Sequence, residues 1–242
     1  MPHFSSAQQR GIEQLARDLE GVFGPRLESV VAYHGNQGDG SVHSCVLVRE
    51  LGFRDLAACL PFTENWRHRG VAVPLMLSTD ELTRTVDVFP LEYAAITADY
   101  AVVRGSDPFA GLAIPVEDVR RAVEALAKSH LIHLREGFLE SHNETTRIAR
   151  LIAASAAPLR ALLVQIARLP DAGHGGVAGA LPSDESLAAL AEQRIGIPAP
   201  LIRTVLAASA NGQSTITDPG HLLGGYIEAA QKIWHYVDRW RA

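Results

Sequence analysis

The chain has 242 residues, a formal net charge of −5 at pH 7, 47% hydrophobic residues and 20% charged residues. This length suits one large domain or two smaller ones, and the composition is ordinary for a globular protein. The negative balance argues against an extended nucleic-acid-binding surface, because phosphate contacts need clustered lysine and arginine side chains.

The first half of the chain alternates between helix and strand patterns. A helix is predicted after a serine cap at Ser5 or Ser6, and the pair Gly24-Pro25 ends it. The later expected elements are strands at 27–33 and 44–48, a helix at 53–67 interrupted near Pro61, and strands at 71–77, 91–96 and 101–104. Ser78 and Glu81 have the spacing of a capping box, which predicts a short helix between the third strand and Pro90.

The second half, from about Pro115, has only helical patterns. The expected helices cover 116–138 and 143–168, then begin at Ser183, after the segment 196–200, and near Asp218. We therefore expect an α+β chain of two domains. Residues 1–112 would form a mixed-sheet domain with helices, and residues 113–242 an all-helical bundle.

The sequence predicts a cytoplasmic protein. Cys45 and Cys59 lie in apolar stretches without metal-site spacing, which is typical of reduced core thiols. The N-terminus lacks a basic segment followed by an apolar run, so no signal peptide is expected. The most apolar stretch contains Pro158 and Arg160, which favours a buried helix over a membrane span.

The stretch from Val30 to Glu50, VVAYHGNQGDGSVHSCVLVRE, combines a strand, a glycine-rich turn and a second strand. Transfer of a nucleoside monophosphate needs Mg²⁺ held by carboxylates, and backbone N–H groups that approach the phosphates. A strand, a turn and a second strand can supply both the carboxylates and the backbone N–H groups when an Asp-x-Asp pair begins the second strand. Alternation along that strand points both carboxylates to one face.

This stretch resembles the nucleotidyltransferase fold of the DNA polymerase beta superfamily. More narrowly, the chain is similar to an uncharacterised bacterial group of two-domain nucleotidyltransferase-like proteins. The resemblance also covers VAVPLMLSTDEL (71–82), DVFPLEY (87–93), VVRGSDPFAGL (102–112) and YIEAAQKIWHYVD (226–238). It implies a nucleotidyltransferase-like sheet domain followed by a helical bundle, with a nucleotide or a phosphate as the ligand of the turn.

The resemblance also implies where the functional residues lie. The superfamily signature is a Gly-Ser pair followed by Asp-x-Asp or Asp-x-Glu at the start of the next strand. Here Val42 and Ser44 match the two carboxylates, and Glu92 matches the third carboxylate or catalytic base. The implied nucleotide-binding residues are Gly35, Asn36, Gly38, Asp39 and Ser44.

Valine offers a metal no lone pair and serine offers a neutral one, so a single remaining carboxylate would not hold Mg²⁺ against water. We therefore expect a catalytically degenerate protein without a resident cofactor, acting as a ligand-binding or regulatory module. One alternative is an active Mg²⁺-dependent nucleotidyltransferase that uses Asp39 and Glu92 on a small molecule or a protein. Another is a structural or partner-binding protein, in which Asp39-Gly40 serves only a hairpin-like connection.

Histidines of the helical half form two weaker patterns. His130 and His133 have the helical spacing of metal ligands, but no acidic residue completes the set, so a helix interface is the commoner interpretation. Arg135 and His142 have an Arg-x6-His spacing that resembles some helical ribonucleases and is common by chance.

Three aromatic residues, Trp234, Tyr236 and Trp240, cluster near the C-terminus. Aromatic residues at this spacing usually pack a last helix against its neighbours. A homodimer contact and a ligand-stacking surface are the alternatives.

Overall fold

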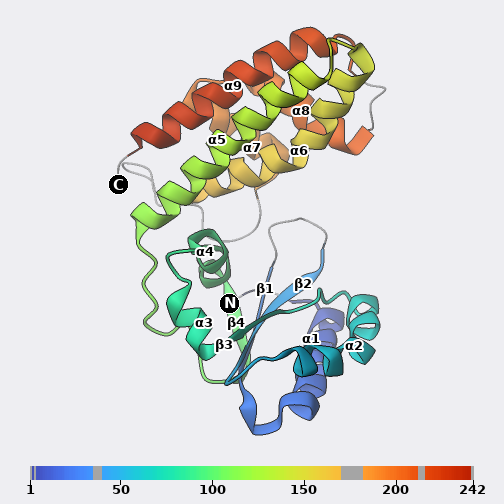
Figure 1. Cartoon of the computed structure of the whole chain (residues 1–242), viewed down its shortest axis with the longest axis vertical. Helices are drawn as coiled ribbons and strands as arrows, with labels where there is room; N and C mark the ends of the chain where they lie inside the picture. The colour runs from blue at the N-terminus through green and yellow to red at the C-terminus, as the bar shows by residue number, and fades with distance from the viewer. Residues whose placement is uncertain (1, 3, 35–39, 170–181, 212–215, 241–242) are drawn as a thin grey trace. The chain divides into compact units, whose positions relative to one another are not determined.

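The computed structural model describes the chain apart from residues 1, 3, 35–39, 170–181, 212–215 and 241–242. It divides into two compact units, residues 1–115 and residues 116–242, which are described separately (Figure 1). The structure is α+β, with a mixed sheet in the first unit and helices in the second.

Within the described residues, the first unit contains a four-stranded sheet in the order β3-β2-β1-β4. The strands are β1 (Leu27–His34), β2 (Val42–Val48), β3 (Leu75–Ser78) and β4 (Tyr100–Gly105). Strand β1 pairs antiparallel with β2 and β4, and β3 lies parallel to β2. The two central strands are the most buried, as expected of strands that are covered on both faces.

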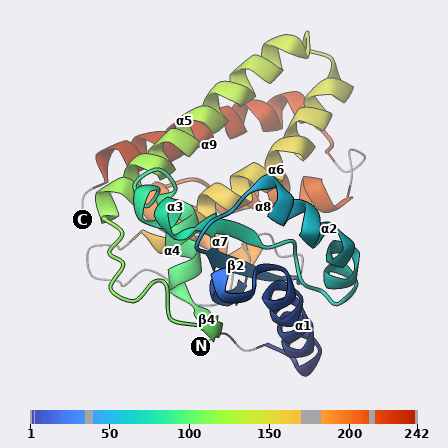
Figure 2. The ribbon, with the colours of Figure 1, turned by 60° about the horizontal axis from the view of Figure 1, so that its bottom comes forward.

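Helices cover both faces of this sheet. The helices α1 (Ser6–Phe23) and α2 (Phe53–His68) lie on one side, and α3 (Thr79–Arg84) and α4 (Pro90–Ala98) lie on the other (Figures 1 and 2). We call the two sides the α1/α2 face and the α3/α4 face. The predicted serine caps are present, because Ser5 accepts a hydrogen bond at α1 and Ser78 accepts one at α3.

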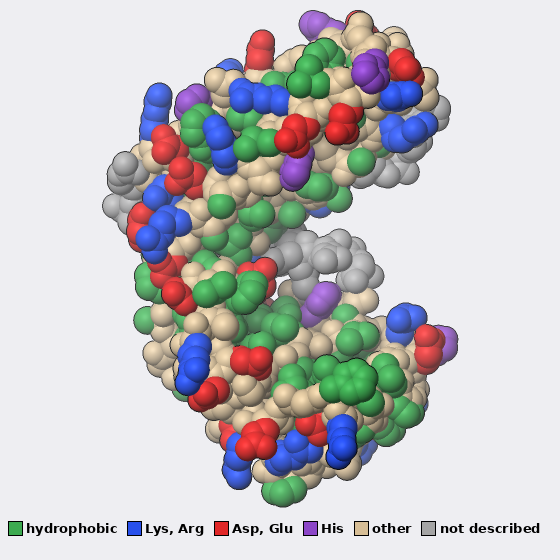
Figure 3. Space-filling model, in the orientation of Figure 1, with side chains coloured by type: hydrophobic (Ala, Val, Ile, Leu, Met, Phe, Trp, Pro, Cys, Tyr) green, Lys and Arg blue, Asp and Glu red, His purple; other side chains and the backbone are tan. Residues whose placement is uncertain are grey.

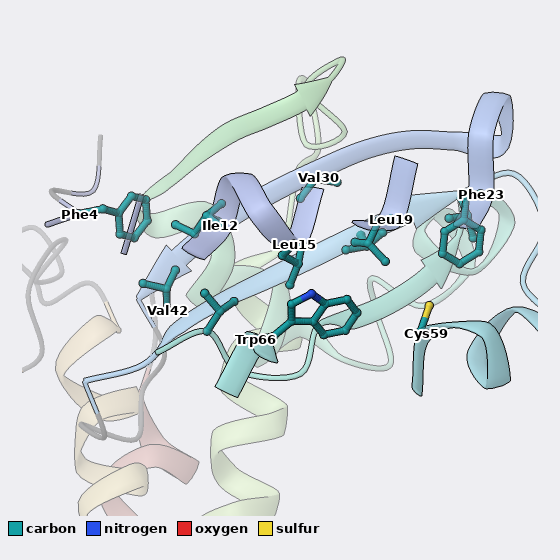
Figure 4. Close-up of a cluster of buried hydrophobic side chains, with 13 residues drawn as sticks. Phe4, Ile12, Leu15, Leu19, Phe23, Val30, Val42, Cys59 and Trp66 are labelled. Atoms are coloured by element: carbon teal, nitrogen blue, oxygen red, sulfur yellow. The ribbon is translucent and has the colours of Figure 1, made fainter. Parts of the chain in front are cut away.

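The α1/α2 face packs a continuous apolar core. Leu15 and Leu19 of α1 meet Trp66 of α2 and Val30 of β1 in this cluster (Figure 4). The Trp66 indole donates to Asp18 at 2.8 Å, so its polar nitrogen is satisfied inside the core.

The prediction of a strand at 91–96 is wrong, because these residues belong to α4. Pro90 occupies the first helical turn, where its missing N–H costs nothing, and Glu92 follows in the same turn. A short apolar run does not by itself distinguish a buried strand from a buried helix.

Proline residues also account for two differences in detail. Pro74 lacks an N–H for the ladder, and β3 begins at Leu75 after an isolated bridge between Val71 and Val42. Pro61, where an interruption was predicted, lies inside α2, which continues to His68.

The second unit is built from α5 (Val116–Glu140), α6 (Thr145–Arg168), α7 (Asp184–Leu190), α8 (Ala199–Asn211) and α9 (Pro219–Arg239). A π-helical turn, η2 (Ala191–Ile195), follows α7. Helix α5 packs along α9 and α6, while α6 also contacts α8, as Figures 1 and 2 show. Leu131, Leu159 and Ile233 are among the side chains buried between these helices.

Helix α6 is long and apolar enough to cross a membrane by length and composition. The core helix of a soluble protein passes the same test, and 56% of the apolar window of α6 is buried inside the structure. Its burial against α5 and α8 is the behaviour of a core helix, as the sequence predicted from Pro158 and Arg160.

Candidate functional site

The side chains of strand β2 point alternately to the two faces of the sheet. This alternation shows on which face the predicted metal-binding positions lie. Val42 and Val46 belong to the core cluster of the α1/α2 face. Ser44 lies between them at the same period of two, and it is 1% exposed. The two positions that match carboxylates by resemblance therefore point into the apolar core.

Ser44 Oγ is enclosed in this core without a hydrogen-bond partner among the described residues. A carboxylate at position 42 or 44 would be buried among valine and leucine side chains, where an unpaired charge is very costly. The register of β2 thus explains why a valine and a serine, and not two acids, occupy these positions in this fold.

The α3/α4 face carries the polar side chains of the same strands. His43 of β2 and Tyr33 of β1 are paired across the strands, with ring centroids 5.8 Å apart. Both residues are partly buried, next to the end of the strand pair that leads into the turn. Cys45, the next residue of β2 on this face, is fully buried.

Glu92 lies on the exposed side of the first turn of α4 and comes close to this face. Burial, with smaller contributions from the neighbouring Cys45 and Glu92, raises the pKa of Tyr33 to about 12. Burial also raises the pKa of Tyr93, whose hydroxyl lies 2.7 Å from the hydroxyl of Thr85. The face thus presents neutral phenols, an imidazole and one carboxylate.

The remaining predicted nucleotide-binding residues, Gly35, Asn36, Gly38 and Asp39, lie outside the described residues. Ser44 is described, but its side chain faces the core. The prediction that the turn binds a nucleotide therefore stays a prediction, and its described neighbours are Tyr33 and His43.

The donor set of the described residues does not fit a divalent metal. No group of three or more His, Cys, Asp and Glu side chains in the described part of the chain is placed to hold an ion. Burial raises the pKa of Cys45 to about 12, so this thiol is protonated and a poor ligand. Glu92 is the one described carboxylate of the predicted set, and a single carboxylate does not satisfy Mg²⁺.

His130 and His133 of the helical unit lie in different environments. His130 is buried and lies 2.7 Å from the Tyr226 hydroxyl, whereas His133 is exposed and lies 3.4 Å from Glu136. Arg135 donates to Gln231 on α9, and His142 has a positive φ of 49° in the connection after α5. These contacts favour the interpretation of helix packing over that of a metal site.

Sequence reasoning missed Tyr33 and His43. The sequence did contain a signal for His43. Val42 and Val46 are apolar positions of one strand face, and alternation places His43 on the opposite face. Alignment to a family signature directed attention to positions 42 and 44 instead, one residue away from the polar side of the strand.

No protein-family model matches the chain, and no curated protein matches it either. The face in view in Figure 3 shows acidic and basic side chains interspersed over the surface. The candidate site thus depends on the geometry of the sheet and on the resemblance stated above.

Proposed function

We propose that the protein is a catalytically degenerate nucleotidyltransferase-like module that binds a nucleotide or a phosphate without transferring it. One observation carries the proposal: Val42 and Ser44 of β2, which the resemblance matches to the metal-binding carboxylates, are enclosed in the core. No oxygen-rich pair can form there without burying charge.

Further support comes from the sheet and the helical unit. The antiparallel pair β1 and β2 ends at the glycine-rich turn and forms the centre of a mixed sheet. In the second unit, α5, α6, α8 and α9 share one core, which suits the proposed helical bundle. The buried free thiols of Cys45 and Cys59 suit the reducing cytoplasm.

The ligand site in this proposal is the α3/α4 face next to the turn. The Tyr33 phenol donates a hydrogen bond at neutral pH, because its raised pKa keeps it protonated. The His43 ring, partly buried beside Tyr33, adds a polar group to this face. These groups can hold a phosphate or a base without a metal ion, while Glu92 disfavours a bare anion in its direct vicinity.

Calorimetric titration with ATP, in the presence and in the absence of Mg²⁺, tests the proposal. We expect the same affinity in both conditions, no release of pyrophosphate, and binding about tenfold weaker in His43→Ala. Glu13→Gln, on the exposed side of α1, is the matched control for Glu92→Gln.

The result separates the three functions. Binding that requires Mg²⁺ and disappears in Glu92→Gln, but not in Glu13→Gln, would establish the active-enzyme alternative. If the first unit of the wild-type protein binds neither ATP nor inorganic phosphate, the structural or partner-binding alternative is the one that remains.

A further inference from the structure

The helical unit contains an open cavity of about 510 Å³ between η2 and the C-terminal half of α9. Arg194 of η2 contributes to its wall, and Lys232 and Arg239 contribute from α9. All three side chains are cationic at neutral pH, and the described lining includes no acidic residue. The volume falls in the range of small-molecule sites.

Helical periodicity explains how α9 builds its side of the cavity. Lys232, His235, Tyr236 and Arg239 line it, at relative positions i, i+3, i+4 and i+7, and the C-cap residue Trp240 follows them. Residues at these positions form one stripe of a helix. The stripe combines positive charge with two aromatic rings, of which Trp240 is 7% exposed.

The opposite wall is an unusual backbone element. Residues Ala191–Ile195 form the π-helical turn η2, which ends at Gly196 with a positive φ of 73°. Turns of this kind are rare and are often found at functional sites. Here η2 presents Arg194 and Ile195 to the cavity.

Backbone carbonyls hold two of the cations in place. Arg194 Nη1 lies 3.5 Å from the Ile166 carbonyl oxygen and 3.4 Å from that of Leu169, at the end of α6. Lys232 Nζ donates to the Gly196 carbonyl at 3.2 Å, which joins α9 to the end of η2. The charges are thus oriented before any ligand arrives, which lowers the entropic cost of binding.

Favourable interactions with helix C-termini explain only part of why these cations lie together. Cations near helix C-termini are favourable, and α6, η2 and α9 all end close to the cavity. This effect does not account for an open volume lined by aromatic rings beside the cations. In a chain with a net charge of −5, concentrating positive charge in one cavity favours an anionic ligand.

We propose that this cavity binds a nucleoside monophosphate. Arg194, Lys232 and Arg239 contact the phosphate, and Tyr236 contacts the base. A guanidinium matches the geometry of phosphate oxygens, and an aromatic ring stacks on any base. The site lies wholly in the second unit and does not depend on the function proposed for the first.

The experiment titrates AMP, inorganic phosphate and adenosine into the full chain, with calorimetry as the readout. We expect AMP to bind more tightly than phosphate or adenosine. The double variant Lys232→Gln/Arg239→Gln should weaken AMP binding about tenfold or more. The control Arg10→Gln/Arg54→Gln makes the same change of charge at exposed sites of the first unit and should leave the affinity unchanged.

A second variant separates the two halves of the ligand. Tyr236→Leu should weaken AMP binding and leave the binding of inorganic phosphate unchanged. Equal affinity of AMP for the wild type and the cavity double variant would overturn the proposal, as would inorganic phosphate binding as tightly as AMP. If His43→Ala still weakens ligand binding in the double variant, the weakened site lies in the first unit and not in this cavity.

Discussion

Two buried polar side chains, Ser44 in the sheet unit and His130 in the helical unit, differ in their hydrogen bonding. In the sheet unit, Ser44 Oγ is enclosed by apolar side chains without a partner among the described residues. In the helical unit, His130 lies 2.7 Å from the Tyr226 hydroxyl, which donates to the Ser155 carbonyl at 3.3 Å. A bonded polar group specifies how helices pack, whereas an unbonded one costs stability, so the two sites should respond oppositely to substitution.

The largest effect is expected from a charge placed in the sheet core. Ser44→Asp buries a carboxylate without a partner and should lower the free energy of unfolding by roughly 3–5 kcal/mol. His43→Asp puts the same group on the partly buried α3/α4 face, with an expected loss of about 1 kcal/mol. Urea unfolding at pH 7 measures both, and equal losses would mean that positions 43 and 44 do not lie on different faces.

The helical unit should lose stability in acid because of His130. Burial, with a smaller contribution from His133, lowers the pKa of His130 to about 4. An unfolded histidine has a pKa near 6.5, so the unfolded chain binds more protons between about pH 6.5 and 4. Stability from this residue is complete above that window and falls with pH through it, by up to about 3 kcal/mol.

Urea unfolding at several pH values in this window measures the loss, with His130→Gln as the comparison. Glutamine can keep a hydrogen bond to Tyr226 and does not titrate. The variant should therefore have the shallower pH dependence. The same pH dependence in both proteins would mean that His130 titrates alike in the folded and unfolded chains.

The smallest effect is expected from removing the unbonded hydroxyl. Ser44→Ala should leave the free energy of unfolding unchanged or raise it by about 0.5 kcal/mol, because no hydrogen bond is lost. Ser29 is the matched control: it is equally buried in the same sheet, and its Oγ donates to the Ser106 carbonyl at 2.8 Å. Ser29→Ala should cost about 1 kcal/mol, and a similar cost at Ser44 would reveal a partner for its hydroxyl.

Local signals predicted much of this fold. The capping boxes at Ser5 and Ser78 and the serine cap at Ser183 begin helices where the sequence indicated. The central strands follow from their apolar runs. Helix α4 did not follow, because the run after Pro90 is short enough for either element and packing of Tyr93 and Ile96 on the sheet decides between them.

The candidate site was less predictable than the fold. The family resemblance directed attention to the β1–β2 pair, but the polar residues on its α3/α4 face, Tyr33 and His43, follow from the pleat of the two strands and not from a motif. The cavity of the helical unit combines Arg194 with residues of α9 that lie about forty positions later, and spacing along the chain carries no sign of that meeting.

The sequence by itself determined which side chains share a face, because a strand alternates every two residues and a helix repeats every 3.6. It also determined where most helices begin, because caps are local hydrogen bonds. Only the tertiary structure decided which helices cover each face of β2, since α1 and α2 come from segments on either side of the β1–β2 pair. Adjacent polar residues of one strand thus become a fully buried serine and a partly buried histidine through the helices that cover the two faces.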